Sequence, residues 1–153
     1  MEERIEKHAP ESALPEFPNC FICGKRNTRG LRIPFYIHEK SVRATFVPDE
    51  TLVGYEDAIH GGIISALLDE AIVWASYAFT KRFGVTAELI VRFLKPLHVN
   101  EECTIVGKMI EDKGRIWIVE GKMMNAKGDL VARAKGKVIP RLKDDAGVNS
   151  YES

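Results

Sequence analysis

The sequence has no excess of charge of either sign. Its 153 residues include 22 lysines and arginines and 22 aspartates and glutamates. A domain whose main partner is a nucleic-acid backbone carries a clustered positive excess, which is missing here. We therefore expect no nucleic-acid ligand.

Cysteine is scarce, and the first residues lack the pattern of an export signal. The chain has three cysteines, and an odd number argues against a disulfide framework. Residues 1–18 are charged and interrupted by three prolines, whereas a secretory signal has a basic start and then an apolar run. We expect a soluble, cytoplasmic protein.

Long uninterrupted apolar runs are also missing. The longest apolar region, residues 63–79, contains Asp69 and Glu70, whose charges would be costly at the centre of a bilayer. Hydrophobic residues nevertheless make up 45% of the chain, which is enough for one ordinary core. We expect one domain and no membrane partner.

Three segments differ in their pattern. Residues 1–30 show neither helical nor strand period and are predicted to form an extended N-terminal arm. Residues 31–140 are predicted to form the folded domain, and residues 141–153 a polar C-terminal tail. Within the domain, alternation over residues 31–37 and 42–46 predicts a first pair of strands.

One long helix and four later strands complete the prediction. Residues 60–83 read as about six helical turns without an internal proline. Alternation returns over residues 87–93, 103–109, 117–123 and 130–138, with glycine-bearing turns before the last two. No helix-length spacer separates these strands, so the sheet is antiparallel and the fold class is α+β.

The helix carries two adjacent carboxylates on different faces. At about 100° per residue, Asp69 shares a face of small or polar residues with Ser65 and Ser76, whereas Leu67 and Ala71 lie roughly opposite. Asp69 has apolar neighbours in sequence, so it needs a partner, a raised pKa or a chemical role. Glu70 is interpreted as a solvated helix-surface residue.

Two glycines stand at the predicted helix start. His60 is followed by Gly61 and Gly62, and Asp69 comes nine residues after the histidine. Glycines there let a ligand approach the backbone, and the free N–H groups at the positive end of the helix dipole suit a developing oxyanion. The alternative is a plain flexible helix entry.

The string HGGIISALLDEA, followed by TAELIVRFLKP, resembles the PaaI-like branch of the hotdog-fold thioesterases. The resemblance covers about residues 31–140. It implies a long helix wrapped by an antiparallel sheet, with two chains joined so that active sites form between them. It also implies acyl-CoA hydrolysis without metal or bound cofactor, and a homodimer or homotetramer.

The resemblance also implies roles for individual residues. The Gly61 N–H, helped by Gly62, would polarise the thioester carbonyl, and His60 would orient that loop or the carbonyl. Asp69 from the partner chain would act as general base or as nucleophile. Thr86 matches a Ser or Thr that holds the water in relatives, although alternation places it on the face opposite Ala87 and Leu89.

The sequence departs from the family at one position. Many relatives have an asparagine about six residues before the histidine, and this chain has Gly54 there. Asp57 is a candidate substitute. On the sheet, Arg92, Lys95 and Arg133 are candidate contacts for the phosphates of CoA, or simply solvent-facing residues.

Cys20 and Cys23 have the spacing of half a zinc site. No second pair of this kind exists, and a tetrahedral site would need His8, His38, His98, Cys103 or a partner chain. We therefore expect two ordinary thiols and no metal.

Two other functions share the fold. One is a hydratase or dehydratase of acyl thioesters, whose members often have prolines after the loop histidine. The other is a non-catalytic acyl-CoA-binding protein of the kind joined to DNA-binding domains, for which residues 1–30 are too short and too proline-rich to supply a helix-turn-helix. A retained Asp69 favours turnover.

Overall fold

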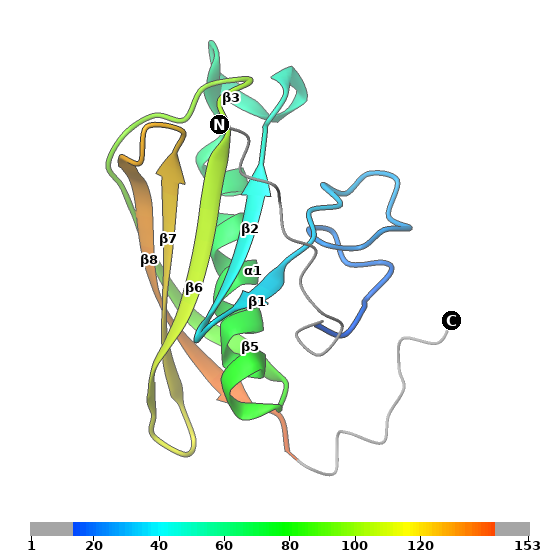
Figure 1. The fold of residues 1–153 in the computed structure, drawn as a ribbon, viewed down its shortest axis with the longest axis vertical. Coiled ribbons are helices and arrows are strands. Elements are labelled where there is room, and N and C mark those ends of the chain that lie inside the picture. The colour runs from blue at the N-terminus through cyan, green and yellow to red at the C-terminus, as the bar shows by residue number, and fades with distance from the viewer. Residues whose placement is uncertain (1–13, 143–153) are drawn as a thin grey trace.

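The structure is a computed structural model that describes residues 14–142 of the chain. One long helix, α1 (Gly61–Thr80), lies against a six-stranded antiparallel sheet in the order β1-β2-β6-β7-β8-β5 (Figure 1). Its strands are β1 (Tyr36–His38), β2 (Ser41–Phe46), β5 (Gly84–Phe93), β6 (Cys103–Asp112), β7 (Trp117–Asn125) and β8 (Leu130–Pro140). A 3-10 turn, η2 (Glu50–Leu52), precedes a small hairpin of β3 (Val53–Tyr55) and β4 (Ala58–Ile59).

The apolar side of α1 forms the centre of the core. Leu67, Leu68 and Ile72 are fully buried. Glycines in the sheet allow a close approach: a Cβ on Gly107 would lie 2.2 Å from the Ala71 carbonyl oxygen, and one on Gly136 would lie 2.9 Å from Ile72. By length and composition alone, α1 is long and apolar enough to cross a membrane, and the core helix of a soluble protein meets the same criterion.

The predicted helix is confirmed, with slightly tighter ends. His60 is the N-cap and its side chain accepts a hydrogen bond from the backbone, a standard way to satisfy an unpaired donor. Lys81 takes the left-handed conformation and its N–H donates to the Tyr77 carbonyl, which ends the helix three residues before the sequence pattern does.

The first predicted strand is shorter than expected. Residues 31–35 were expected to be extended, but β1 begins only at Tyr36. Arg32 has a φ of 54°, which interrupts the strand, and Pro34 has no N–H to donate to a neighbouring strand. The N–H groups of Leu31 and Ile33 donate to the carbonyls of Phe21 and Ile22 instead, so these alternating residues bond to the N-terminal turns rather than to a strand of the sheet.

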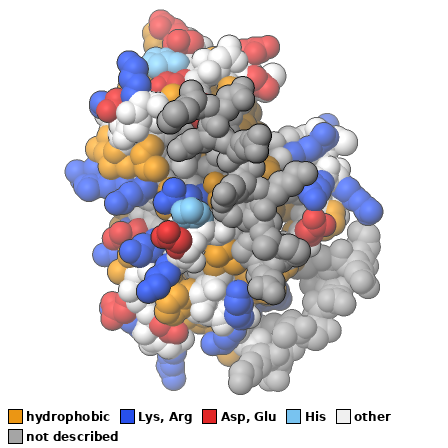
Figure 2. Space-filling model, viewed as in Figure 1, with side chains coloured by type: hydrophobic (Ala, Val, Ile, Leu, Met, Phe, Trp, Pro, Cys, Tyr) orange, Lys and Arg blue, Asp and Glu red, His pale blue; other side chains and the backbone are white. Residues whose placement is uncertain are grey.

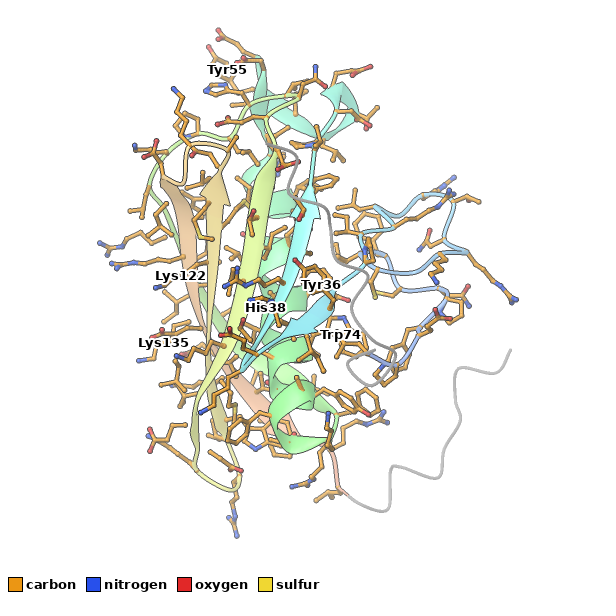
Figure 3. All side chains as sticks on the ribbon, viewed as in Figure 1. Tyr36, His38, Tyr55, Trp74, Lys122 and Lys135 are labelled. Carbon is orange, nitrogen blue, oxygen red and sulfur yellow. The ribbon has the colours of Figure 1, made fainter. Side chains whose placement is uncertain are left out.

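Residues 14–30 form a series of turns that rest on α1 rather than an extended arm. Ile22 and Ile33 are buried in the main core. Phe17 lies 5.8 Å from Trp74 between ring centroids, and Figure 3 shows Trp74 on the side of α1 that faces this segment. The remaining parts of the predicted arm and tail, residues 1–13 and 143–153, lie outside the described residues.

Candidate functional site

Asp69 is held by a hydroxyl from a strand. The Thr86 Oγ1 donates to Asp69 Oδ1 over 2.7 Å, and both side chains are half-buried. Asp69 comes from the middle of α1, and Thr86 comes from the start of β5. A short hydrogen bond from a hydroxyl fixes the orientation of a carboxylate and leaves its other oxygen available for chemistry.

A β-bulge explains why Thr86 points to the helix. The register between β5 and β8 shifts between Thr86 and Glu88, so an extra residue stands in β5 at Ala87. Thr86 therefore shares the helix-facing side with Leu89, and Ala87 is exposed. The prediction that Thr86 lies on the face opposite Leu89 is wrong, because plain alternation assumes a strand without a bulge.

The helix start leaves one backbone donor available. The Gly62 N–H donates to His60 Nδ1 over 2.8 Å, so His60 closes the loop onto the first turn. Gly62 is therefore already engaged and does not share the predicted role of Gly61. Among residues 14–142, no recorded hydrogen bond uses the Gly61 N–H. A free N–H at the N-terminal end of a 20-residue helix is suited to an oxyanion.

These two half-sites do not meet within one chain. Gly61 and Asp69 are eight residues apart in a continuous helix, which separates their backbones by about 12 Å at the usual helical rise. A reacting carbonyl must lie within hydrogen-bonding reach of both groups. One chain supplies both groups, but a single helix does not bring the Gly61 N–H and the Asp69 carboxylate to the same carbonyl.

The loop before His60 has Gly54 where many relatives have an asparagine. A Cβ on Gly54 would lie 3.0 Å from the His60 Cα, so the backbone leaves little room for a larger residue. Asp57 does not stand in for the missing amide at His60, because its carboxylate lies 3.2 Å from His98 Nδ1 instead.

The predicted cations fall into two groups. Arg92 and Arg133 are directly opposite on β5 and β8, and Arg133 is also opposite Lys122 on β7. Like charges in such positions repel one another, which favours an anion above them. Lys95 instead forms an ion pair with Asp129 over 3.3 Å. Figure 3 shows Lys122 on the side of the sheet away from α1, where Lys and Arg side chains also gather in Figure 2.

Glu70 is not the solvated residue that the sequence predicts. Its side chain is half-buried beneath the N-terminal turns, where Oε1 accepts from the Trp74 Nε1 over 2.9 Å and from the Cys20 thiol over 3.4 Å. This burial raises the pKa of Glu70 to about 7. The sequence signal is weak, since Trp74 lies four residues after Glu70 but Cys20 lies fifty residues before it.

Comparison with known sequences gives one family. A family model described as the thioesterase superfamily matches residues 57–132, which include both the helix start and Asp69. An uncharacterised protein of Schizosaccharomyces pombe is 32% identical over 118 residues. The matched part covers 72% of this chain and 67% of that relative.

Solved structures share the architecture. A thioesterase superfamily protein has a TM-score of 0.74 at 24% identity, over 88% of this chain and 74% of that chain. A Streptococcus mutans protein bound to acetyl-CoA has a TM-score of 0.67 at 21% identity, over 71% and 88%. The Escherichia coli PaaI protein has 0.68 at 18%, over 73% and 81%. The predicted hotdog fold is confirmed.

Proposed function

This chain belongs to the thioesterase superfamily, and from that membership we propose that it hydrolyses an acyl-CoA to a carboxylic acid and CoA. The observation that carries the proposal is the Asp69 carboxylate, half-buried in the apolar helix and oriented by Thr86. We place the chain in the PaaI-like branch because its HGG motif and Asp69 have the spacing of that branch. The acetyl-CoA in the S. mutans structure supports a ligand of the CoA type.

In the proposed reaction, the Gly61 N–H donates to the thioester carbonyl oxygen and stabilises its negative charge. Asp69 acts on the carbonyl carbon in one of two ways. As general base it removes a proton from an attacking water, and as nucleophile it forms an anhydride that water then opens. In both, the C–S bond breaks, the sulfur leaves as the CoA thiol after gaining a proton, and a carboxylic acid remains.

We propose that two copies of the chain complete the site. Gly61 and Asp69 of one chain are separated by about 12 Å along α1. The Gly61 N–H of one chain would therefore act together with Asp69 of another chain. Strand β5 is an edge of the sheet and exposes Val85, Ile90 and Phe93 by 61%, 60% and 53%. An apolar edge strand of ten residues is a template for pairing with a second copy.

This pairing also agrees with the local packing at Gly61. The Phe93 ring at the end of β5 lies beside the helix start, since a Cβ on Gly61 would be 3.4 Å from it. The edge strand and the proposed oxyanion donor are therefore neighbours. A homodimer would cover the exposed apolar side chains of β5, and two dimers could form a homotetramer.

We assign the phosphates of CoA to the row of Arg92, Arg133 and Lys122 across three adjacent strands. Neighbouring strands are about 4.8 Å apart, so the three cations can contact one polyanion together. Lys95 already has Asp129 as a partner and would contribute less than predicted from the sequence.

The proposal is tested with a panel of short, long, branched and aryl acyl-CoAs, in which released thiol is trapped with a chromogenic reagent. We expect turnover of at least one member. A folded, dimeric protein that releases no thiol from any member would overturn the proposal.

A further inference from the structure

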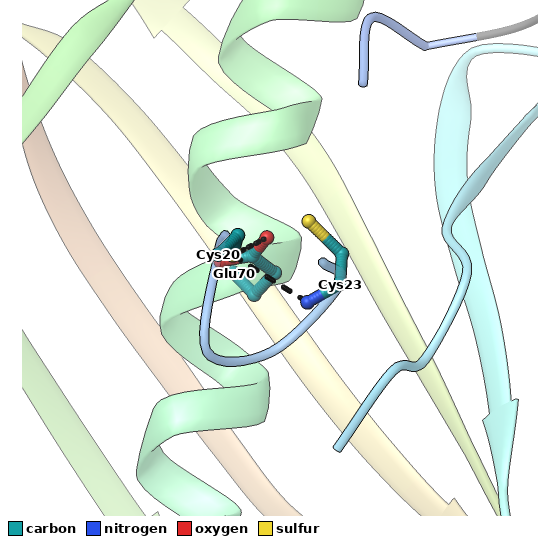
Figure 4. Close-up of side chains that lie close together, drawn as sticks. All are labelled: Cys20, Cys23 and Glu70. Atoms are coloured by element: carbon teal, nitrogen blue, oxygen red, sulfur yellow. Dashed lines mark hydrogen bonds between the residues drawn. The ribbon is translucent and has the colours of Figure 1, made fainter. Parts of the chain in front are cut away.

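A cluster of three metal-ligating groups lies where the N-terminal turns meet α1. The Sγ atoms of Cys20 and Cys23 and a carboxylate oxygen of Glu70 all lie within 4.8 Å of one another (Figure 4). The two cysteines come from an N-terminal turn, whereas Glu70 comes from the middle of α1. We call these three residues the thiol–carboxylate cluster.

The turn that presents the cysteines is held in one shape by its backbone. The Gly24 N–H donates to the Cys20 carbonyl over 2.9 Å, and the Cys23 N–H donates to the Cys20 Sγ over 3.4 Å. A Cβ on Gly24 would lie 2.4 Å from the Cys20 carbonyl oxygen, so this tight turn requires glycine. An N–H that points at sulfur stabilises the thiolate, which is the form that binds a metal.

We propose that the thiol–carboxylate cluster binds one zinc ion, with Cys20, Cys23 and Glu70 as ligands and water in the fourth position. Zinc accepts both thiolate and carboxylate ligands. With Zn–S near 2.3 Å and Zn–O near 2.1 Å, tetrahedral ligand atoms are separated by about 3.6 to 3.8 Å. The Cys20 Sγ and Glu70 Oε1 are already 3.4 Å apart.

The charge around the cluster also favours a cation. Each of the three groups is negative when it loses its proton, and within residues 14–142 no basic side chain forms an ion pair with Glu70. One divalent ion would take the place of the protons on these three half-buried groups.

Trp74 supplies a partner outside the ligand set. Its Nε1 donates to Glu70 Oε1, the same oxygen that faces Cys20, and so fixes the carboxylate toward the turn. Of the completing residues considered from the sequence, His38, His98 and Cys103 are not in the cluster, and His8 lies outside the described residues. The third ligand is instead Glu70.

The proposed ion joins two segments that are fifty residues apart, the N-terminal turn and the central helix. The ion would tether these two segments, and Asp69 and Thr86 meet each other without the cluster. The inference does not rest on the proposed function, because metal content and ligand geometry are measured without any substrate.

The test begins with the full chain purified under reducing conditions. We expect about one zinc per chain by elemental analysis, in keeping with a single cluster. Replacing zinc with cobalt should give the sulfur-to-cobalt absorption of a tetrahedral site with two thiolates. Zinc affinity should fall by more than about 100-fold in Cys23→Ser and in Glu70→Gln, beyond the loss typical of an outer partner. Cys103→Ala, which removes the cysteine outside the cluster, should keep the zinc.

Two results would overturn the inference. One is a folded wild-type chain with three free thiols that binds neither zinc nor cobalt at micromolar concentration. The other is a metal-free chain in which Cys20 and Cys23 form a disulfide, so that only Cys103 reacts before reduction and no metal binds after it. Circular dichroism shows whether each variant is folded, so that loss of metal binding is not mistaken for loss of the fold.

Discussion

At the scale of single residues, the proposed catalysis depends on how Asp69 is held. Its position was predictable, because a carboxylate among apolar neighbours on a helix indicates a special role. Its partner Thr86 was indicated only by the family resemblance, because the bulge at Ala87 reverses the side to which plain alternation would point it. A bulge adds one residue without changing the composition of a strand, and so leaves little trace in a pattern of alternation.

Replacing Asp69 should separate catalysis from folding. Asp69→Asn keeps the size of the side chain and its acceptor for Thr86 but removes the base, so turnover should fall by about 10²- to 10⁴-fold. Glu88→Gln is the matched control, since Glu88 lies on the same strand as Thr86 and forms an exposed ion pair with Lys137. Steady-state rates on dimeric protein measure both. Equal losses in the two variants would refute the assignment.

The Thr86 hydroxyl should contribute through Asp69. Thr86→Val keeps the shape but removes the donor, and losing a hydrogen bond to a charged group should lower turnover by about 10- to 100-fold. Thr86→Ser keeps a hydroxyl and should retain most of the activity. If the valine variant is as active as wild type, the 2.7 Å contact has no part in the reaction.

At the scale of elements, the end of α1 gives a test of the oxyanion donor. Gly61→Pro removes the N–H, while a proline is tolerated at the first helical position and His60, with φ −57° and ψ 132°, suits a residue before proline. We expect turnover to fall by about 10²- to 10³-fold, the range for losing one such donor. Gly61→Ala adds the same Cβ beside Phe93 but keeps the N–H, so it should lose far less.

Elements with a strong period were predictable, and those held by tertiary contacts were not. Helix α1 and strands β5 to β8 lie where their helical and strand periods predict, although the bulge at Ala87 interrupts the alternation of β5. Residues 31–35 alternate like a strand, yet Arg32 and Pro34 interrupt them and their N–H groups bond to the N-terminal turns. Glu70 looked solvated because the segment that buries it lies fifty residues away in sequence.

The tether between the N-terminal turn and α1 predicts a stability effect without a matching loss of activity. Zinc at about 100 times its Kd would add about 2.7 kcal/mol, so a strong chelator should lower Tm by roughly 5 to 10 °C for a chain of this size. Thermal melting with and without chelator measures this. Activity assayed well below Tm should stay within about threefold, because the proposed reaction uses a backbone donor and a carboxylate.

Glu70 gives a reversal in the order of Tm values that is expected only if it binds the metal. Burial raises its pKa to about 7, so at pH 8 the metal-free chain contains a charged carboxylate that burial disfavours. Without metal, the Tm of Glu70→Gln should therefore be higher than that of wild type. With zinc added, the Tm of wild type should be higher than that of Glu70→Gln. The same order of Tm values in both conditions would contradict the role of Glu70 as a ligand.

At the scale of the whole molecule, the sequence indicates a second copy only indirectly. The polar face of α1 suggested that something covers it, but which surface is exposed depends on the strand order, which places β5 at the edge of the sheet. That edge exposes apolar residues and lies beside Gly61. We propose that Gly61 of one chain and Asp69 of another form each site.

Mixing two inactive variants tests this claim most directly. Asp69→Asn and Gly61→Pro chains are unfolded together and refolded, or expressed together, and the activity of the mixture is compared with that of each variant alone. Random pairing makes half of the dimers mixed, and each mixed dimer has one intact site, so activity should recover to about one quarter of wild type. If each site is instead built from a single chain, every site contains a substitution and the mixture stays as inactive as its components.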